Sequence, residues 1–329
     1  MAILTSDALH TLLVSALRTK GFSAENADAL ARQTVLTEQL GQTSVGVAHV
    51  FDYINSIDNG RIDGEAVPTV ARPAPTMIHV DGNGGLAQTG FDQAFDDLVS
   101  GAHEFGMCVF LQKNTMLCGS LGTFALRTAN AGLISIAASN GSPLLAGSGS
   151  DKPVYCTNPL AFSAPLSDKP PLLIDQSSSA TAYVNIRSAA EQGNDIPLGW
   201  AIDKHGKPTT DAKAALEGTL LAFGGARGAN MALMVEVLAG GLTGANWSLD
   251  APSFIEGDEC PATGLFVLAI DPTLIDAGFS ARMTQQIDRL ASDYRVHIPG
   301  LSKANSLSRS IRDGIEVKDC MISQLQSMV

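Results

Sequence analysis

Aromatic residues are scarce in this chain. They make up only 5% of its 329 residues, although 45% are hydrophobic. A core of this size therefore has to be built mainly from Ala, Leu, Val and Gly, which suits helices packed closely against sheets. We expect a globular chain of the α/β class, long enough for two domains, or three if small ones are counted.

Runs of lysine or arginine are also absent. The 21 basic residues are outnumbered by 33 acidic ones, which gives a net charge of −12. A field of this sign repels phosphate backbones and anionic lipids, so we expect neither nucleic acid nor a membrane as partner. An anionic substrate would need a local basic pocket, which directs attention to Arg227, Lys303 and His49.

Paired cysteines and long apolar runs are missing as well. The five cysteines lie far apart and form no CxxC motif, which argues against a disulfide framework and against a metal site. The first 20 residues lack a basic start followed by an apolar run and a cleavage site. The most apolar long stretch, 230–245, contains Glu236 and is too short to cross a bilayer. We expect a cytoplasmic protein in which 230–245 is a buried helix.

The first 60 residues are predicted to be helical. Leucines recur with helical spacing over 6–20, and Gly21 follows where a helix would end. A second helix, 23–40, starts at the cap residue Ser23. A third is expected from about Val45 to Ile57.

Beyond the proline-rich segment 68–75, strands and helices alternate. The sequence predicts helices over 88–105 and 120–130, and strands over the apolar runs 77–80, 107–111, 133–138, 172–174 and 265–270. A last helix, 280–293, is expected to return to the N-terminal helices. We therefore expect a helical domain over 1–75, an α/β cofactor domain over 76–279, and a C-terminal segment, 280–329, that rejoins the helical domain.

Neither a GxGxxG fingerprint nor a phosphate loop is present. Several glycine clusters occur instead, and each taken alone is also compatible with an ordinary turn. The most informative is Gly224–Gly228, because it precedes an apolar helix and holds Arg227. Free backbone N–H groups and a guanidinium at a helix N-terminus bind phosphate. The polar loop 194–211, which is rich in Pro and Gly, is a second functional candidate.

Several segments together resemble one enzyme family. Thr157–Ala161 is similar to its TNP turn, Asp175–Ser179 to its DMATS segment, and Gly224–Gly228 to its GGxKG motif with Arg in place of Lys. Residues 199–211 are similar to its GWAxDxxGxPTTD, and Pro299-Gly300 to the start of its PGERR. In order, these matches resemble the type-2 malate/L-lactate dehydrogenase family, whose relatives include ureidoglycolate dehydrogenases, diketogulonate reductases and cyclic ketimine reductases.

The resemblance implies a fold other than the Rossmann type, NAD or NADP as cofactor, and a small 2-oxo or cyclic 2-imino carboxylic acid as substrate. It also implies a homodimer. The substrate candidates are Asn114, Thr115 and Thr157. The residues implied to line the cofactor are Gly119, Ser120, Leu121, Asp175, Gln192, Gly193, Asn194, Arg227, Gly228, Pro299, Gly300 and Lys303.

The chain departs from the family at two histidines. The family's SHGxxR corresponds to Ser44–His49, so Val45 stands at the histidine and His49 at the substrate-facing arginine. A second family histidine, in NSxHxG, corresponds to Leu117. Reduction of a ketone needs a proton delivered to the developing oxyanion, which valine and leucine cannot supply.

His49 lies four residues after Val45 on the same predicted helix, so its ring is a candidate replacement. We expect Ser44, His49 and Asp195 to position and protonate the substrate, with Asp195 paired to His49. The plainer alternatives are a surface hydrogen bond for His49 and a turn or cap for Asp195.

A cyclic ketimine offers another answer to the missing histidines. Its protonated form already accepts a hydride and yields an amine, so no acid is needed at an oxygen. This favours an imino acid slightly over an oxo acid. The competing hypothesis is a catalytically silent family member that binds cofactor or a small acid as a sensor.

Overall fold

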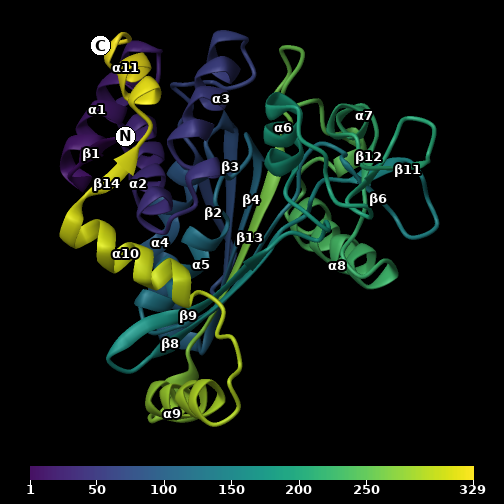
Figure 1. Ribbon diagram of the computed structural model, residues 1–329. Coiled ribbons are helices and arrows are strands. Elements are labelled where there is room, and N and C mark those ends of the chain that lie inside the picture. The colour runs from purple at the N-terminus through teal and green to yellow at the C-terminus, as the bar shows by residue number, and fades with distance from the viewer.

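Three helices form the N-terminal part of the computed structural model, which describes residues 1–329 (Figure 1). Helices α1 (Ser6–Thr19), α2 (Ala24–Gln39) and α3 (Val47–Asp58) confirm the three that were predicted. The Ser23 hydroxyl accepts a hydrogen bond from the Asn26 N–H, as a helix cap does. Gly21 has φ +96°, which lets the chain turn away after α1.

The start of α3 corrects one expectation. Thr43–Val45 forms a separate 3₁₀ turn (η1), and Gly46, at φ −91° and ψ −126°, breaks the chain before α3. Val45 and His49 are therefore not on one helix. The Glu38 carboxylate causes this break: it accepts a hydrogen bond from the Val47 N–H at 2.7 Å and fills the space where a side chain at position 46 would lie.

A seven-stranded mixed sheet forms the centre of the molecule. Only β3 and β4 run parallel, and the other neighbouring pairs are antiparallel. All five predicted strands are present. The proline-rich segment is the edge strand β2 and not merely a spacer, because an edge strand tolerates residues without an N–H. In spatial order the strands are β2 (Thr69–Ala74), β3 (Met77–Gly85), β4 (Met107–Thr115), β13 (Thr263–Ile270), β5 (Ile134–Ser139), β8 (Leu160–Leu166) and β9 (Lys169–Gln176).

The two predicted helices α4 (Ala87–Phe105) and α5 (Gly122–Asn130) pack against this sheet. Their shared core includes Phe91, whose ring meets those of Phe110 and Phe124 edge to face with centroids 5.3 and 5.0 Å apart. Three of the chain's phenylalanines thus fill the space between helix and sheet.

A second, smaller sheet lies beside the first, on the right in Figure 1. Its strands are, in order, β11 (Pro208–Thr209), β10 (Ala201–Ile202), β12 (Thr219–Leu220), β6 (Leu145–Ala146) and β7 (Pro153–Tyr155). The helices of this region are α6 (Tyr183–Gln192), α7 (Ala212–Leu216) and α8 (Ala226–Glu236), with short turns η3 (Ser248–Asp250) and η4 (Pro272–Leu274) further along the chain.

The buried helix expected at 230–245 is only partly buried. Helix α8 continues as a π-helical turn, η2 (Val237–Gly241), and no helix is long and apolar enough to span a membrane. About half of the surface of Leu233, Met234 and Val237 is exposed. Apolar composition alone did not reveal that one face of this helix has no covering element within the chain.

The expected return of residues 280–293 is wrong. Helix α9 (Phe279–Ser292) contacts β8 and has no buried residue. The return is made later, by α10 (Leu301–Asp313) along α2, by β14 (Ile315–Val317), which pairs with β1 (Ala2–Leu4), and by α11 (Asp319–Gln326) against α1. Both ends of the chain lie together at the upper left of Figure 1.

Candidate active site

A cavity of about 180 Å³ lies between α3 and α6 and reaches the loops that follow β4 and β5. Its ionisable side chains are His49, Asp52 and Arg187. Thr157, in the turn before β8, and Gly119 also line it. The remaining wall is largely apolar and includes Val45, Leu117, Leu144, Pro159, Val184 and Phe254.

Helix α3 holds the His49 ring in a fixed orientation. Its Nδ1 lies 2.8 Å from Oδ2 of Asp52, one turn further along the helix. The ring also meets Tyr53 edge to face at 4.9 Å, and the Tyr53 hydroxyl donates to the Leu117 carbonyl at 2.6 Å. Because a carboxylate at Nδ1 requires the proton on that nitrogen, Nε2 is left free for a ligand. The side chain is 14% exposed.

Asp52 connects His49 to Arg187. Its Oδ1 lies 3.6 Å from Nη1 of Arg187, on α6. Burial raises the pKa of Asp52, but the hydrogen bond from His49 and the charges of His49 and Arg187 outweigh it, so that the pKa lies below its ordinary value. Asp52 is therefore an anion at neutral pH and can orient both His49 and Arg187.

Asp195 does not pair with His49 in the chain, contrary to expectation. It is exposed, and its backbone forms an isolated β-bridge with Asp211. Asp52 takes its place because position i+3 on a helix lies within reach of His49, whereas residue 195 follows the far end of α6. Ser44 borders a neighbouring cavity of about 560 Å³ that shares Asp52 and Arg187 with the first.

Of the three substrate candidates, only Thr157 lines the cavity. Asn114 is in the left-handed region, at φ +55°, and its amide donates to Asp81 at 3.0 and 3.1 Å. Thr115 is 1% exposed, and its hydroxyl donates to the Thr263 carbonyl at 3.3 Å. The polar groups of both residues are thus engaged within the sheet region.

Several cofactor candidates are joined in one hydrogen-bonded network beside the cavity. The Asp175 carboxylate accepts from Nζ of Lys303 and from the amide of Gln42, each at 3.1 Å. The side-chain amide oxygen of Gln42 in turn accepts a hydrogen bond from the Ser120 hydroxyl at 3.0 Å. Gly119, the preceding residue, lines the substrate cavity, so this network adjoins it. Leu121, at the start of α5, is buried.

The other candidates lie on three loops. Pro299 and Gly300 precede α10, and Gly300 packs against Leu173 of β9. Gln192, Gly193 and Asn194 are exposed at the end of α6. Arg227 is exposed in the first turn of α8, while Gly228 is buried against Phe223 and Ser178.

These residues fit a dinucleotide in two respects. Gly224 and Gly225 have φ +57° and +63°, and a side chain at either would meet nothing within 4 Å, so the backbone before α8 is open to a ligand. With the nearby guanidinium of Arg227, this helix start suits a phosphate group. The Asp175 carboxylate, 10% exposed, suits hydroxyl or amide donors.

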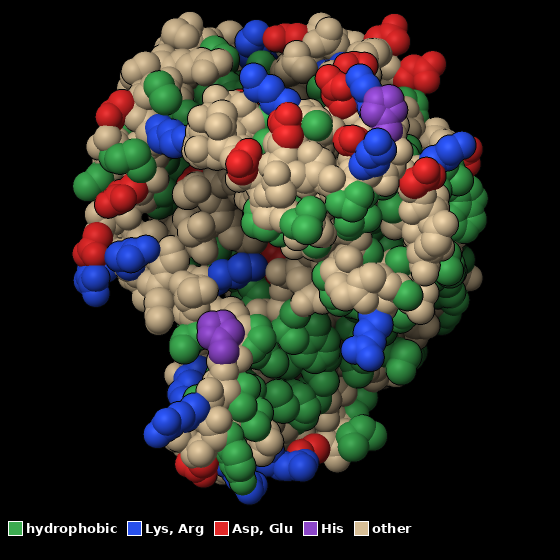
Figure 2. Space-filling model, turned by 45° about the vertical axis from the view of Figure 1, so that its right-hand side comes forward, with side chains coloured by type: hydrophobic (Ala, Val, Ile, Leu, Met, Phe, Trp, Pro, Cys, Tyr) green, Lys and Arg blue, Asp and Glu red, His purple; other side chains and the backbone are tan.

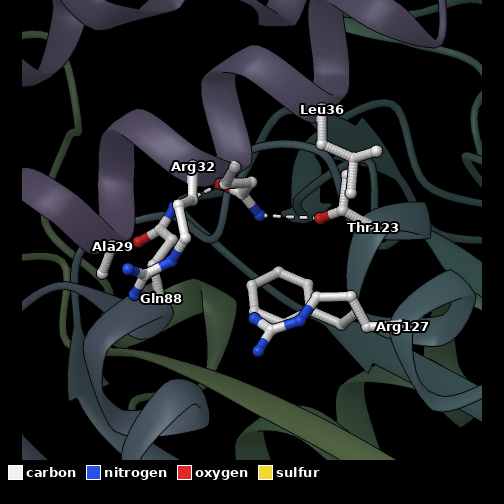
Figure 3. A pocket seen from close by; sticks show the side chains of 8 residues that line it. Ala29, Arg32, Leu36, Gln88, Thr123 and Arg127 are labelled. Atoms are coloured by element: carbon white, nitrogen blue, oxygen red, sulfur yellow. Dashed lines mark hydrogen bonds between the residues drawn. The ribbon is translucent and has the colours of Figure 1, made fainter. Parts of the chain in front are cut away.

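A different cavity, of about 280 Å³, lies between α2, α4 and α5 (Figure 3). It has two arginines but no free cation. Arg32 pairs with Asp28 and Asp92, and Arg127 pairs with Asp92. Arg127 also lies over the rings of Phe91 and Phe95, at 5.1 and 4.7 Å. Since both charges are compensated, this larger cavity is a poorer site for an anionic substrate than the one at His49.

The fold and the site define a class, and comparison with known proteins agrees. The chain belongs to the malate/L-lactate dehydrogenase family, whose profile matches residues 4–326, and it is therefore an enzyme. The resemblance found in the sequence motifs is confirmed.

Individual relatives cover the whole chain. It is 32% identical to a (2R)-3-sulfolactate dehydrogenase (NADP(+)) from Chromohalobacter salexigens, over 97% of this chain and 95% of that one. It is 30% identical to a Delta(1)-pyrroline-2-carboxylate/Delta(1)-piperideine-2-carboxylate reductase from Pseudomonas aeruginosa, over 100% of both. The crystal structure of the delta1-piperideine-2-carboxylate reductase from Pseudomonas syringae pvar. tomato superposes with a TM-score of 0.96, at 30% identity, over 100% of both chains.

Sequence reasoning missed Asp52, Arg187 and Gln42. A signal for Asp52 existed, because it stands three residues after His49 on a predicted helix. No local signal pointed to Arg187 or Gln42. Their roles depend on tertiary contacts of α6 with α3 and of the α2 end with β9.

Proposed function

We propose that the chain transfers a hydride between NAD(P) and a small 2-oxo or cyclic 2-imino carboxylic acid, which interconverts with its 2-hydroxy or 2-amino acid. The observation that carries this proposal is the oriented His49–Asp52 pair in a cavity that adjoins Gly119. The relatives at 30 to 32% identity, named as an NADP(+) dehydrogenase and as ketimine reductases, support the same chemistry.

The chain's residues supply binding and the proton. The bound nicotinamide supplies or accepts the hydride. In reduction of an oxo acid, His49 delivers a proton from Nε2 to the developing oxyanion, while Asp52 keeps the ring oriented through Nδ1. Asp52 thus has the orienting role that the sequence suggested for Asp195. Thr157 offers a hydroxyl to the substrate, and we keep Ser44, at the neighbouring cavity, and the exposed Asp195 as candidates.

The cofactor is held in this proposal by two groups of residues. Lys303, Asp175 and Ser120 bind it on the side of α5, with Pro299 and Gly300 beside them. The loop before α8, with Arg227, takes a phosphate. We propose that the dinucleotide lies on this mixed sheet rather than in a doubly wound parallel one.

A cyclic imino acid is the favoured substrate. Val45 and Leu117 remove two imidazoles from the wall of the cavity, and a protonated ketimine needs no acid at an oxygen. The test is the absorbance of the reduced cofactor with a panel of oxo and imino acids, including Δ1-pyrroline-2-carboxylate. We expect oxidation with at least one of them. Silence across both classes, in protein that binds the cofactor, would sink the proposal.

A second candidate function rests on the same two positions. Val45 and Leu117 also suit a protein that binds cofactor or a small acid as a sensor, without turnover. The two hypotheses differ in what His49 does. In an enzyme that reduces an oxo acid, His49→Ala lowers turnover strongly, whereas in a sensor the only effect to look for is on ligand affinity.

We further propose a homodimer in the cytoplasm. Figure 2 shows hydrophobic side chains gathered over the lower half of one face, and α8 exposes Leu233 and Met234. All five cysteines are free, which suits a reducing compartment. Residues 1–75 and the returning segment from α10 onward would form one domain, and the central sheet with its helices the other. Light scattering of the purified protein tests the dimer: a monomer mass at micromolar concentration would contradict it.

A further inference from the structure

Arg187 is the one permanent cation that lines the candidate substrate cavity. Its guanidinium contacts the Asp52 carboxylate at 3.6 Å, which is longer than a direct hydrogen bond. It makes no other ion pair or hydrogen bond within the chain. The side chain is 34% exposed. Since a guanidinium has five N–H donors in a planar fork, most of its donors are available to a ligand.

The position of Arg187 suits a substrate carboxylate. Asp52 binds His49 through Oδ2 and lies beside Arg187 through Oδ1, so one carboxylate holds both side chains close together. In a 2-oxo or 2-imino acid the reacting carbon is bonded directly to the carboxylate. A carboxylate that forks onto Arg187 therefore brings this carbon next to the imidazole of His49.

The rest of the cavity provides no second cation. Its wall continues with Val45, Leu117, Val184 and Phe254. Arg187 and Asp52 together carry no net charge, and the chain as a whole carries −12. A bound carboxylate would share the Arg187 guanidinium with Asp52, whereas a second anionic group would meet no further cation. The polar side chains of Ser139, Asn140 and Ser177 already donate to backbone carbonyls.

We propose that Arg187 is the single carboxylate anchor and that the substrate is a monocarboxylic acid with an apolar chain or ring. This inference rests on the proposed function and narrows it. It separates the chain from its relative named for sulfolactate, a molecule with both a carboxylate and a sulfonate. Δ1-Pyrroline-2-carboxylate, with one carboxylate on a hydrocarbon ring, has the expected form.

The kinetic test compares Arg187→Met and Arg187→Lys with the wild type and with the exposed-site control Arg282→Met. We expect Arg187→Met to raise KM for the monocarboxylate roughly 10- to 100-fold, the value for a lost hydrogen bond to a charged group. Its kcat should change less than the KM does. Arg187→Lys should restore part of the affinity, and Arg282→Met should behave as wild type. An unchanged KM in folded Arg187→Met would overturn the proposal.

A binding test does not depend on turnover. Calorimetry with pyrrole-2-carboxylate and its uncharged amide, in the presence of cofactor, measures the contribution of the carboxylate directly. In the wild type we expect the acid to bind more tightly than the amide. In Arg187→Met we expect the acid and the amide to bind equally weakly. If the acid keeps this advantage in Arg187→Met, the anchor lies elsewhere.

Substrate charge gives the last arm. We expect the wild type to prefer the monocarboxylate over sulfopyruvate and oxaloacetate by at least 100-fold in kcat/KM. Equal use of a dianion would overturn the proposed specificity while leaving hydride transfer intact. Conversely, carboxylate-dependent binding without turnover of any substrate would refute the proposed function and keep Arg187 as the anchor.

Discussion

Arginine and aspartate occur together in two cavities of this molecule, with different results. Between α2, α4 and α5, Arg127 pairs closely with Asp92 and stacks over two phenylalanine rings. In the cavity at His49, Arg187 lies 3.6 Å from Asp52 and does not stack over an aromatic ring. The first guanidinium is closely paired and stacked, and the second is held by one long contact.

This difference separates structural charge from functional charge. An arginine whose charge is closely paired and whose face lies over aromatic rings stabilises the packing of helices and offers less to a ligand. An arginine held by one long contact is positioned while most of its N–H donors stay available to a ligand.

His49→Ala should produce the largest effect on turnover. If it did not, the His49 cavity would not be the catalytic one of the two. We expect kcat for an oxo acid to fall roughly 10²- to 10⁴-fold, because the proton donor is lost, while the unfolding free energy changes little. Stopped-flow or steady-state absorbance of the reduced cofactor measures it. His205→Ala, in an exposed loop, is the matched control. Turnover of His49→Ala near the wild-type rate would place the donor elsewhere.

Glu38→Gln tests the two cavities through the pH dependence of stability. Helix α2 carries Glu38 toward α3 and the His49 cavity, and Arg32 toward the other cavity. Burial raises the pKa of Glu38 from 4.5 to about 7, against the opposing effect of the Val47 N–H. Because its pKa is raised in the folded state, Glu38 favours folding when it is protonated. This contribution to the unfolding free energy is fully present below pH 4.5 and is lost as the pH rises through about 7.

The wild type should therefore lose up to about 3 kcal/mol of unfolding free energy, relative to Glu38→Gln, between pH 5 and pH 8. Urea unfolding of both proteins at several pH values measures the difference. Glutamine keeps an acceptor for Val47 but cannot ionise. Parallel pH profiles for the two proteins would show that Glu38 does not titrate in this range.

Lys303→Met tests whether the Lys303–Asp175 pair is available to a ligand, as Arg187 is in the His49 cavity, or is engaged within the protein, as Arg127 is. Lys303 and Asp175 are 20% and 10% exposed and pair at 3.1 Å. If Lys303 also attracts the cofactor, its loss should weaken binding of the reduced cofactor about tenfold. Fluorescence titration measures this, with the exposed Lys204→Met as control. Unchanged affinity would make the pair purely structural.

Arg127→Met should have the smallest effect and the opposite character. We expect the unfolding free energy to fall by about 1 kcal/mol, because a partly buried ion pair and two ring contacts are lost. Turnover and substrate KM should stay at wild-type values. A raised KM in this variant would mean that the cavity between α2, α4 and α5 affects substrate binding.

Much of the fold follows from local sequence. Ser23 as a cap and Gly21 after α1 mark helix boundaries, and the apolar runs around Val80 and Val109 are strands because β-branched residues fit a buried sheet. The errors arose where tertiary contacts decide. Nothing local distinguishes α9, which packs on β8, from α10, which returns to α2. The break at Gly46 depends on a carboxylate eight residues earlier in the chain, at Glu38.

The candidate site was only half predictable. Motif resemblance led to Ser120, Asp175 and Lys303, which the fold brings into one network. The partner of His49 was misassigned, because Asp195 was chosen by resemblance while Asp52 is close by helical geometry. Arg187 could not be found from sequence, since its proximity to Asp52 arises only when α6 packs beside α3.

The pairing of β1 with β14 has a consequence for how the enzyme is made. Ala2 pairs with Val317, and the core behind α3 includes Ile315, Val317 and Leu325. This core cannot close while those residues are still inside the ribosome, so the scaffold that holds His49 matures after synthesis of nearly the whole chain. The central sheet, whose strands end at residue 270, is free to form earlier.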